Sequence, residues 1–378
     1  MTAAKWPEVA LGDVCKFKYG KSLPATQRAG GTTPVFGSNG VVGHHDQAVT
    51  NGSTVVVGRK GSFGEVHFSP DACWPIDTTY FIDSTCTTTD LRWLYWMLPK
   101  LNLTSLNRAA AIPGLNREDA YARRLHLPSI EEQRRIAGVL DQADALRATR
   151  REALALLETL TESIFLDMFG DPVSNPMRWD RVPLGQILSR IDSGKSPVCL
   201  SRRAEPGEWG VLKLGAVTWC EYDDQENKAL PADVDPIEAH EVRTGDLLFA
   251  RKNTSDLVGA CALVHSTRPR LLLSDLIFRL VPAPDAPVVP AYLHRLMTLR
   301  AKQREIQKLA SGSAGSMPNI SKKRLLEASV ELPPIDLQNT LAERVAGVAA
   351  ERRRLERSAE RLDELFASLQ QRAFRGEL

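Results

Sequence analysis

The sequence lacks most of the features that would mark a membrane protein, a secreted protein or a metalloprotein. No apolar run of about eighteen residues or more occurs, so no transmembrane helix is predicted. None of the six cysteines belongs to a C-x-x-C pair, which argues against structural zinc and against a disulfide framework. Residues 1–9 show no charged segment followed by an apolar one, so no secretory signal is predicted. We therefore expect a cytoplasmic protein without a metal site.

Catalytic motifs are missing as well. The glycine-rich segment 58–64 lacks the spacing of a phosphate-binding loop, and no G-x-S-x-G motif occurs. In the only adjacent pair of histidines, His44 and His45, the side chains would point to opposite faces of a strand. Asn175-Pro176-Met177 begins like the Asn-Pro-Pro-aromatic motif of amino-methyltransferases, but it lacks the second proline and the aromatic residue. We expect no catalytic residue and no cofactor in this chain.

The composition itself is that of an ordinary globular protein. The chain has 378 residues, of which 43% are hydrophobic and 25% are charged, enough for two or three domains with their own cores. The formal net charge is only +2, and the small excess of bases lies in segments 1–126 and 172–331. Charge alone therefore neither requires nor excludes a nucleic-acid partner.

The most informative feature is an internal repeat. The motif at 127–133 (LPSIEEQ) returns at 332–338 (LPPIDLQ), 205 residues later, and each copy runs into a long helical pattern. The same offset, without a gap, matches further identical residues: Ala137 with Ala342, Arg147 with Arg352, Leu157 with Leu362, Leu160 with Leu365, Ser163 with Ser368 and Phe169 with Phe374. This period is too long for a solenoid and indicates two large units in one chain.

The two helical stretches, about 128–171 and 336–375, carry apolar residues at steps of four and three, which keep one stripe facing a partner helix. We expect helix packing and partner contacts from Ile136, Leu140, Leu157, Ile164, Leu341, Val345, Leu362 and Leu369. Both stripes are interrupted at the same place, by Arg147 and Arg352. These arginines either form a polar layer that fixes the register or extend out of the seam over their aliphatic stems, and we prefer the second interpretation.

The predicted fold class is α+β, with two globular α/β domains separated by two long antiparallel helices in a pseudo-two-fold arrangement. The domains are predicted at 1–127 and 173–332, and the helical spacers at 128–172 and 333–378. A helix of roughly 38 residues would span about 57 Å at 1.5 Å per residue. The second globular segment echoes the first, because Gly20-Lys21-Ser22 matches Gly194-Lys195-Ser196 and Arg59-Lys60 parallels Arg251-Lys252. Their middles barely align, which indicates one scaffold with two different surfaces.

Over nearly its whole length the chain resembles the specificity subunits of type I restriction-modification systems. The similarity is strongest in the repeated segments 127–136 and 332–338 and in the segments that close the helices, 168–172 and 373–378. Segments 59–66 and 112–117 also look like the recognition domains of that family. One departure is Leu337, where the family usually has glutamate before the glutamine.

The resemblance implies a non-catalytic reader of double-stranded DNA. Two target recognition domains would each bind one half of a split, asymmetric sequence, with half-site centres roughly 34–36 Å apart. The helices would act as a ruler and as the docking site for two methyltransferase subunits, which would bind S-adenosylmethionine. Motor-nuclease subunits that use ATP would join for restriction. A different class of function stays open: a helical-hairpin scaffold that binds proteins without reading DNA.

A position shared by both globular segments suits contact with phosphate, because phosphates carry no sequence information. The shared positions are Lys21 with Lys195 and the two Arg-Lys pairs, while a basic stretch near 300–308 and the loops before two short helices add further candidates. The predicted DNA-contacting residues are Lys21, Arg59, Lys60, Asn116, Arg117, Lys195, Arg251, Lys252, Arg300, Lys302, Arg304, Asn319 and Lys322. Each cation could instead be an ordinary solvated charge, and each asparagine could bond only to its own backbone.

Overall fold

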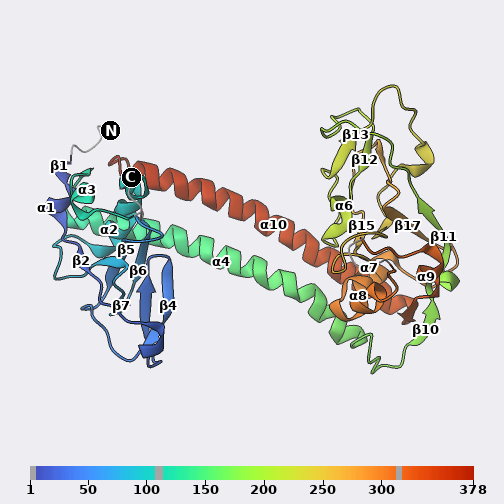
Figure 1. Ribbon diagram of the computed structural model, residues 1–378, viewed down its shortest axis with the longest axis horizontal. Helices are drawn as coiled ribbons and strands as arrows, with labels where there is room; N and C mark the ends of the chain where they lie inside the picture. Colours follow the sequence, from blue (N-terminus) through green and yellow to red (C-terminus); the bar gives the residue numbers. More distant parts are fainter. Residues whose placement is uncertain (1–5, 107–113, 312–316) are drawn as a thin grey trace. The chain divides into compact units, whose positions relative to one another are not determined.

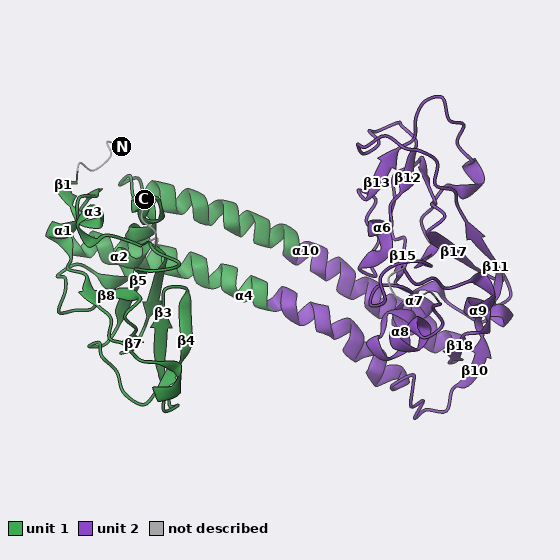
Figure 2. Ribbon diagram, in the orientation of Figure 1, with its two compact units in different colours: residues 1–152, 356–378 green, residues 153–355 purple. Residues whose placement is uncertain are grey.

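The computed structural model describes residues 6–106, 114–311 and 317–378, and Figure 1 labels many of their helices and strands. The chain divides into two compact units (Figure 2). Unit 1 comprises residues 1–152 and 356–378, and unit 2 comprises residues 153–355. Each of the two long helices is therefore shared between the units. The four-segment division drawn from the sequence stays a prediction.

Unit 1 contains three small sheets. The first pairs β1 (Glu8–Ala10) with β9 (Arg124–His126) in antiparallel register. The second is antiparallel and has the order β2 (Lys18–Tyr19), β8 (Thr79–Ile82), β5 (Thr54–Gly58), β6 (Val66–Ser69). The third has the order β4 (Gly40–His45), β3 (Thr33–Gly37), β7 (Trp74–Pro75), with β3 and β7 parallel. Strand β5 is buried along its whole length, which suits its run of β-branched residues.

Short helices complete unit 1. They are α1 (Leu11–Val14), α2 (Leu91–Met97) and α3 (Arg117–Tyr121), with 3-10 turns η1 (Ala25–Gln27), η2 (Leu98–Leu101) and η3 (Leu103–Ser105). The Asp90 carboxylate caps α2 by accepting a hydrogen bond from the Trp93 N–H. Trp93 is fully buried in the main core of the unit, where it joins residues of β5 and β8 such as Val55 and Ile82.

Unit 2 repeats this set of sheets. β10 (Asp180–Pro183) pairs with β18 (Ser329–Leu332). An antiparallel sheet has the order β11 (Leu188–Ser193), β17 (Ile277–Pro282), β14 (Leu247–Ala250), β15 (Cys261–Leu263). A third sheet has the order β13 (Asn227–Ala229), β12 (Gly210–Leu212), β16 (Leu271–Leu272). The helices are α5 (Leu184–Ile187), α6 (Gly215–Thr218), α7 (Pro290–Thr298), α8 (Arg300–Gln307) and α9 (Lys322–Glu327), with one 3-10 turn, η4 (Glu238–His240).

The two units share one topology, which confirms the predicted duplication of the globular parts. The order β2-β8-β5-β6 corresponds to β11-β17-β14-β15, and β4-β3-β7 corresponds to β13-β12-β16. In both three-stranded sheets the same pair is parallel, β3–β7 in one and β12–β16 in the other. The main difference lies between the first two strands of that sheet. β3 and β4 form a tight hairpin, whereas residues 213–226, with α6, connect β12 to β13.

The long helices are α4 (Ile130–Phe169) and α10 (Ile335–Ala373), within a few residues of the predicted bounds. In unit 1 the start of α4, through Ile136 and Leu140, shares a core with Phe366 and Ala373 near the end of α10. In unit 2 the end of α4, through Phe165 and Phe169, shares a core with Leu341 near the start of α10. Within each unit the helices therefore run antiparallel. No helix among the described residues combines the length and apolarity needed to cross a membrane.

Six of the eight stripe residues belong to these cores or pack against them. Ile136, Leu140 and Leu341 are fully buried. Ile164, Val345 and Leu369 are half-buried and pack against the cores, and Leu157 and Leu362 are half-buried. The preferred interpretation of Arg147 is wrong. Its Nε donates to Asp363 Oδ1 of the other helix at 2.6 Å, and its guanidinium lies 4.3 Å from the Phe366 ring centroid, so it bridges the two helices instead of extending into solvent.

The glutamine of the repeat ties each long helix to the start of an earlier helix, α2 in unit 1 and α7 in unit 2. In unit 1, Gln133 Nε2 donates to the Pro128 carbonyl, and Gln133 Oε1 accepts from the Asp90 N–H at the start of α2 (2.9 and 2.8 Å). In unit 2, Gln338 Nε2 donates to Pro333 and Pro287, and its Oε1 accepts from the Val289 N–H at the start of α7 (2.8, 2.9 and 2.9 Å). The repeat therefore encodes a structural joint as well as a helix start.

The departure at Leu337 has a local consequence. The matching residue in the first copy, Glu132, forms a two-pronged ion pair with Arg135, with both bonds 2.7 Å long. Leu337 is exposed and lies near Ile335, which is also exposed. The second helix therefore starts with an apolar surface where the first starts with an ion pair.

Candidate nucleic-acid interface

In unit 1 the predicted residue Arg59 lies directly after β5, in a loop that its own backbone holds in place. Its N–H donates to the Thr78 carbonyl and its carbonyl accepts from the Leu115 N–H, both at 2.9 Å. The guanidinium carbon lies 5.1 Å from the ring centroid of Tyr19 and 5.9 Å from that of Tyr80. The loop therefore fixes the cation beside two aromatic rings that come from β2 and β8.

Arg117, the first residue of α3, converges on the same rings. Its guanidinium carbon lies 5.6 Å from the Tyr19 centroid and 5.8 Å from that of Tyr121. Tyr19 and Tyr80 are themselves in contact, with ring centroids 5.1 Å apart, and Tyr19 is 53% exposed. Arg59, Arg117, Tyr19 and Tyr80 thus form a cluster with its exposed ring at Tyr19, which we call the unit 1 cation–aromatic site.

The positive charge of this site is poorly compensated. Among the described residues no carboxylate lies within 4 Å of Arg59, and the half-buried Arg59 has an Nε atom without a hydrogen-bond partner. Within the described part of the chain, the carboxylate close to Arg117 is that of Glu118, at 3.5 Å. Burial raises the pKa of Tyr80 to about 12, so this ring is neutral at ordinary pH and offers only its π face. Cation–π contacts of this kind are worth about 0.5–2 kcal/mol and leave the charge free to attract an anion.

Unit 2 builds the same arrangement from other residues. Arg251 follows β14, its N–H donates to the Leu276 carbonyl, and its carbonyl accepts from the Ile320 N–H (3.0 and 2.8 Å). Its guanidinium carbon lies 5.0 Å from the Phe278 centroid, and Lys322 Nζ lies 5.5 Å from the same centroid. We call Arg251, Lys322 and Phe278 the unit 2 cation–aromatic site.

The strand register shows that the two sites are equivalent. Tyr80 pairs with Val57 across β8 and β5, and Phe278 pairs with Phe249 across β17 and β14, at the same point of the two sheets. Arg117 is the first residue of α3, and Lys322 is the first residue of α9, the corresponding short helix of unit 2. The lysine after Arg59 and the lysine after Arg251 also form equivalent isolated β-bridges. Lys60 pairs with Gly114, and Lys252 pairs with Asn319.

The two predicted asparagines have different roles. Asn116 caps α3, because its side chain accepts a hydrogen bond from the Glu118 N–H at 2.8 Å, which matches the alternative left open for it. Asn319 instead accepts a hydrogen bond from Arg251 Nε at 3.1 Å and so helps to orient that guanidinium. Arg251 also donates to the Asp275 carbonyl at 3.4 Å, and Lys322 to the Ile191 carbonyl at 2.6 Å. None of these partners is a carboxylate.

Other predicted residues lie outside the two sites. Lys21 lies 5.5 Å from the Trp74 ring centroid in unit 1, and Lys195 is exposed in unit 2. Arg300 and Arg304 are exposed on α8. They share a face of that helix because they are four residues apart, whereas position 302 points to the opposite side.

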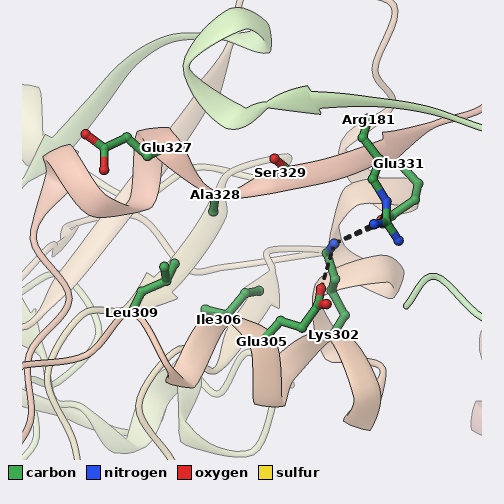
Figure 3. A pocket seen from close by; sticks show the side chains of 9 residues that line it. All are labelled: Arg181, Lys302, Glu305, Ile306, Leu309, Glu327, Ala328, Ser329 and Glu331. Atoms are coloured by element: carbon green, nitrogen blue, oxygen red, sulfur yellow. Dashed lines mark hydrogen bonds and ion pairs between the residues drawn. The ribbon is translucent and has the colours of Figure 1, made fainter. Parts of the chain in front are cut away.

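Lys302 is the one predicted residue that the structure turns inward. It is only 3% exposed, and its Nζ lies 3.0 Å from Glu331 Oε2 and 3.1 Å from Glu305 Oε2. Glu331 also pairs with Arg181 at 2.9 Å, so one buried carboxylate joins α8 to β10 and β18 beside a small cavity (Figure 3). This position withdraws Lys302 from any ligand on the surface, and we remove it from the DNA-contacting group.

The aromatic members of the sites were missed from the sequence. Tyr19, Tyr80 and Phe278 lie far along the chain from the cations they contact, and only strand pairing brings them together. The available signal was the matched Arg-Lys pair, which marks the same place in both units.

The sequence is similar to known proteins of one family. A family model, the type I restriction modification DNA specificity domain, matches residues 4–159. The predicted resemblance is confirmed, because the curated relatives are specificity subunits of type I restriction enzymes.

Two relatives from Escherichia coli illustrate the extent of the match. The chain is 36% identical over 169 residues to the type I restriction enzyme EcoEI specificity subunit, which covers 44% of this chain and 28% of that protein. It is 24% identical over 298 residues to the EcoKI specificity subunit of strain K12, covering 73% of this chain and 62% of that protein. The matched regions thus span less than two thirds of either relative.

Solved structures share the fold of this chain. The type I restriction-modification S subunit from M. genitalium has a TM-score of 0.67 at 14% identity, covering 98% of this chain and 96% of that one. A chain solved in work on complex assembly and conformational transition of the type I system has a TM-score of 0.57 at 17% identity, with full coverage of both. These likenesses confirm the predicted α+β fold.

Proposed function

We propose that this chain is the non-catalytic DNA-reading subunit of a type I restriction-modification complex. It would bind double-stranded DNA with both units and direct methyltransferase and restriction subunits to the bound site. The observation that carries the proposal is the pair of equivalent cation–aromatic sites, one in each unit. Among the described residues, the one carboxylate within 4 Å of their cations is that of Glu118, which lies 3.5 Å from Arg117. The family match supports the same role.

The phosphate backbone of DNA is the same at every sequence, so two equivalent cation sites are well suited to bind it. Arginine and lysine held against aromatic rings keep their charge and lose little entropy when an anion arrives. Arg59 with Arg117 would hold phosphate in one half-site, and Arg251 with Lys322 would do so in the other. The neighbouring Lys60 and Lys252 are exposed and would add to the same contact.

Sequence discrimination would come from the parts of the two units that differ. In unit 1 the tip of the β3–β4 hairpin lies beside Arg59, because Ser38 Oγ donates to the same Thr78 carbonyl that accepts from the Arg59 N–H (2.6 and 2.9 Å). In unit 2 the long connection 213–226 takes that place, where Thr218 Oγ1 accepts from Asn253 Nδ2 at 3.4 Å. The segments beside the two phosphate sites differ from each other. They would therefore read two different half-sites, as a split and asymmetric target requires.

Recruitment of methyltransferase subunits would use the long helices. Leu156 and Leu160 are exposed on α4 one turn apart, and both lie in unit 2. Exposed leucines at this spacing give a helix an apolar surface that a partner protein can cover. Bound S-adenosylmethionine and ATP would belong to the partner subunits.

The test is a binding measurement on the chain co-purified with the methyltransferase subunits of its own system. Arg59→Gln with Arg117→Gln, and separately Arg251→Gln with Lys322→Gln, should each weaken binding to every duplex. Each pair should also lower the slope of log K against log salt by roughly 2, since each phosphate contact contributes about 0.9. Arg243→Gln with Lys228→Gln, two exposed cations of unit 2 outside the sites, is the matched control.

Unchanged affinity and unchanged salt slope in both double variants would refute the proposal. The scaffold alternative predicts a different result for DNA binding by the unaltered chain. Titrated with mixed-sequence duplex at low salt, a protein-binding scaffold would show no association, whereas the proposed subunit would bind with a steep dependence on salt.

A further inference from the structure

The outward face of α8 carries a row of cations. Arg300, Arg304 and Lys308 follow one another at intervals of four residues and are all exposed. Among the described residues no carboxylate lies within 4 Å of any of them, because the acidic neighbour Glu305 is engaged with Lys302 on the inward side. The buried pair of Lys302 with Glu331 fixes which face of α8 is turned outward (Figure 3).

This row is connected to the unit 2 cation–aromatic site through short contacts. Arg324 on α9 donates to the Leu309 carbonyl, directly after Lys308, at 3.0 Å. Two residues further on, Ser311 and Asn319 exchange backbone hydrogen bonds of 3.0 Å, and Asn319 holds Arg251. Lys322, on the same helix as Arg324, reaches Phe278. We call Arg300, Arg304, Lys308, Lys323 and Arg324 the basic track.

Unit 1 has the opposite charge at the matching positions of its own short helix. Arg117 corresponds to Lys322, so Glu118 and Asp119 of α3 occupy the places of Lys323 and Arg324 of α9. The region that corresponds to α8 is formed by the 3-10 turns η2 and η3, whose only cation, Lys100, donates to Gln370 Oε1 at 3.0 Å. Arg123, just after α3, also donates to Ser105 Oγ of η3 at 3.2 Å, but the described residues of unit 1 form no row of cations there that corresponds to the basic track.

We infer that unit 2 holds DNA through a second set of phosphate contacts, made by the basic track, that unit 1 does not make. This inference rests on the proposed function and deepens it. The two units would then contribute unequally to the affinity for DNA. Unit 2 would supply most of the affinity that is independent of sequence, and binding would be more sensitive to salt and to backbone changes in its half-site than in the other.

The experiment uses the complex of the chain with its methyltransferase subunits and a duplex that contains the recognised site. The variant Arg300→Ala, Arg304→Ala, Lys308→Ala removes three contacts, which should lower the salt slope by about 2.7. The ratio of wild-type to variant affinity should then be about 40-fold larger at 50 mM than at 200 mM salt. Hydroxyl-radical footprinting should show lost protection in one half-site only.

A gain-of-charge variant tests the same idea from unit 1. Glu118→Lys gives α3 the residue type found at position 323 and should steepen the salt slope by about 1. Arg243→Gln with Lys228→Gln is again the control, and circular dichroism of each variant checks that its fold is intact.

The outcomes are distinguishable. A normal salt slope for the α8 variant, with a lowered slope for the Arg251→Gln, Lys322→Gln variant, overturns this inference and leaves the proposed function standing. Normal slopes for both overturn both. Loss of the methyltransferase subunits from the α8 variant in the absence of DNA also overturns the inference, because the basic track would then be a protein interface.

Discussion

Replacing Gln338 by leucine should destabilise unit 2 strongly, although the volume of the side chain hardly changes. Gln338 is fully buried and makes three hydrogen bonds, to the carbonyls of Pro333 and Pro287 and from the Val289 N–H. Leucine keeps the packing and removes all three. Each net hydrogen bond is worth about 1 kcal/mol, and a buried donor or acceptor left unsatisfied costs about 1–3 kcal/mol.

These contributions predict a loss of about 3–5 kcal/mol in the free energy of unfolding. For a unit of this size, 1 kcal/mol shifts Tm by about 2–4 °C, so Tm should fall by roughly 10 °C. Scanning calorimetry on the full chain measures this directly. The matching change in unit 1, Gln133→Leu, removes two hydrogen bonds and should cost less, about 2–3 kcal/mol.

The control is Gln371→Leu, at an exposed position of α10. It should leave Tm within about 1–2 °C of the unaltered chain, since surface substitutions stay within about 0.5 kcal/mol. If Gln338→Leu changed Tm no more than this control, the reasoning that the repeated glutamine is a structural joint would be refuted.

Three further predictions concern charge and pH. Arg92→Ala should cost about 2–3 kcal/mol, measured by urea unfolding, because the guanidinium pairs with Asp141 of α4 and lies 4.3 Å from the Phe68 ring centroid; a cost below about 0.5 kcal/mol would contradict this. Burial lowers the pKa of His294 to about 4, below its unfolded value, so stability that is present above about pH 6.5 should be lost as pH falls toward 4, and His294→Gln should flatten that pH dependence. Burial raises the pKa of Tyr80 to about 12, so stability that is complete below about pH 10 should be lost as pH rises toward 12; Tyr80→Phe, which copies Phe278 of unit 2, should remove that loss in alkaline melting curves.

The long helices and the duplication could be predicted because their signals are local or periodic. The LPxxxxQ motif and the four-three stripes placed α4 and α10 within a few residues. Matching Arg59-Lys60 with Arg251-Lys252 located the same loop in both units, although the sequences around the pairs barely align. Periodicity and matched positions survive divergence of everything between them.

The remaining features depend on contacts that no local pattern reveals. In the sequence, Lys302 looks like its neighbours Arg300 and Arg304. In the structure, however, the extended backbone of Leu299 ends α7 and begins α8, and this break determines which face of α8 is buried. The basic stretch near 300–308 does not reveal that phase in the sequence. Likewise, Tyr19 and Phe278 meet their cations only through strand register. The preference for a solvent-directed Arg147 failed because its partner, Asp363, lies on the other helix.

The central claim is that two equivalent cation–aromatic sites each hold the phosphate backbone of one half-site. Phosphate ethylation interference on the complex tests it most directly. The account predicts two separate clusters of interfering phosphates, and the Arg59→Gln, Arg117→Gln variant should lose interference in one cluster while the other is unchanged. A single cluster, or two clusters that both survive in this variant and in the Arg251→Gln, Lys322→Gln variant, would contradict the account.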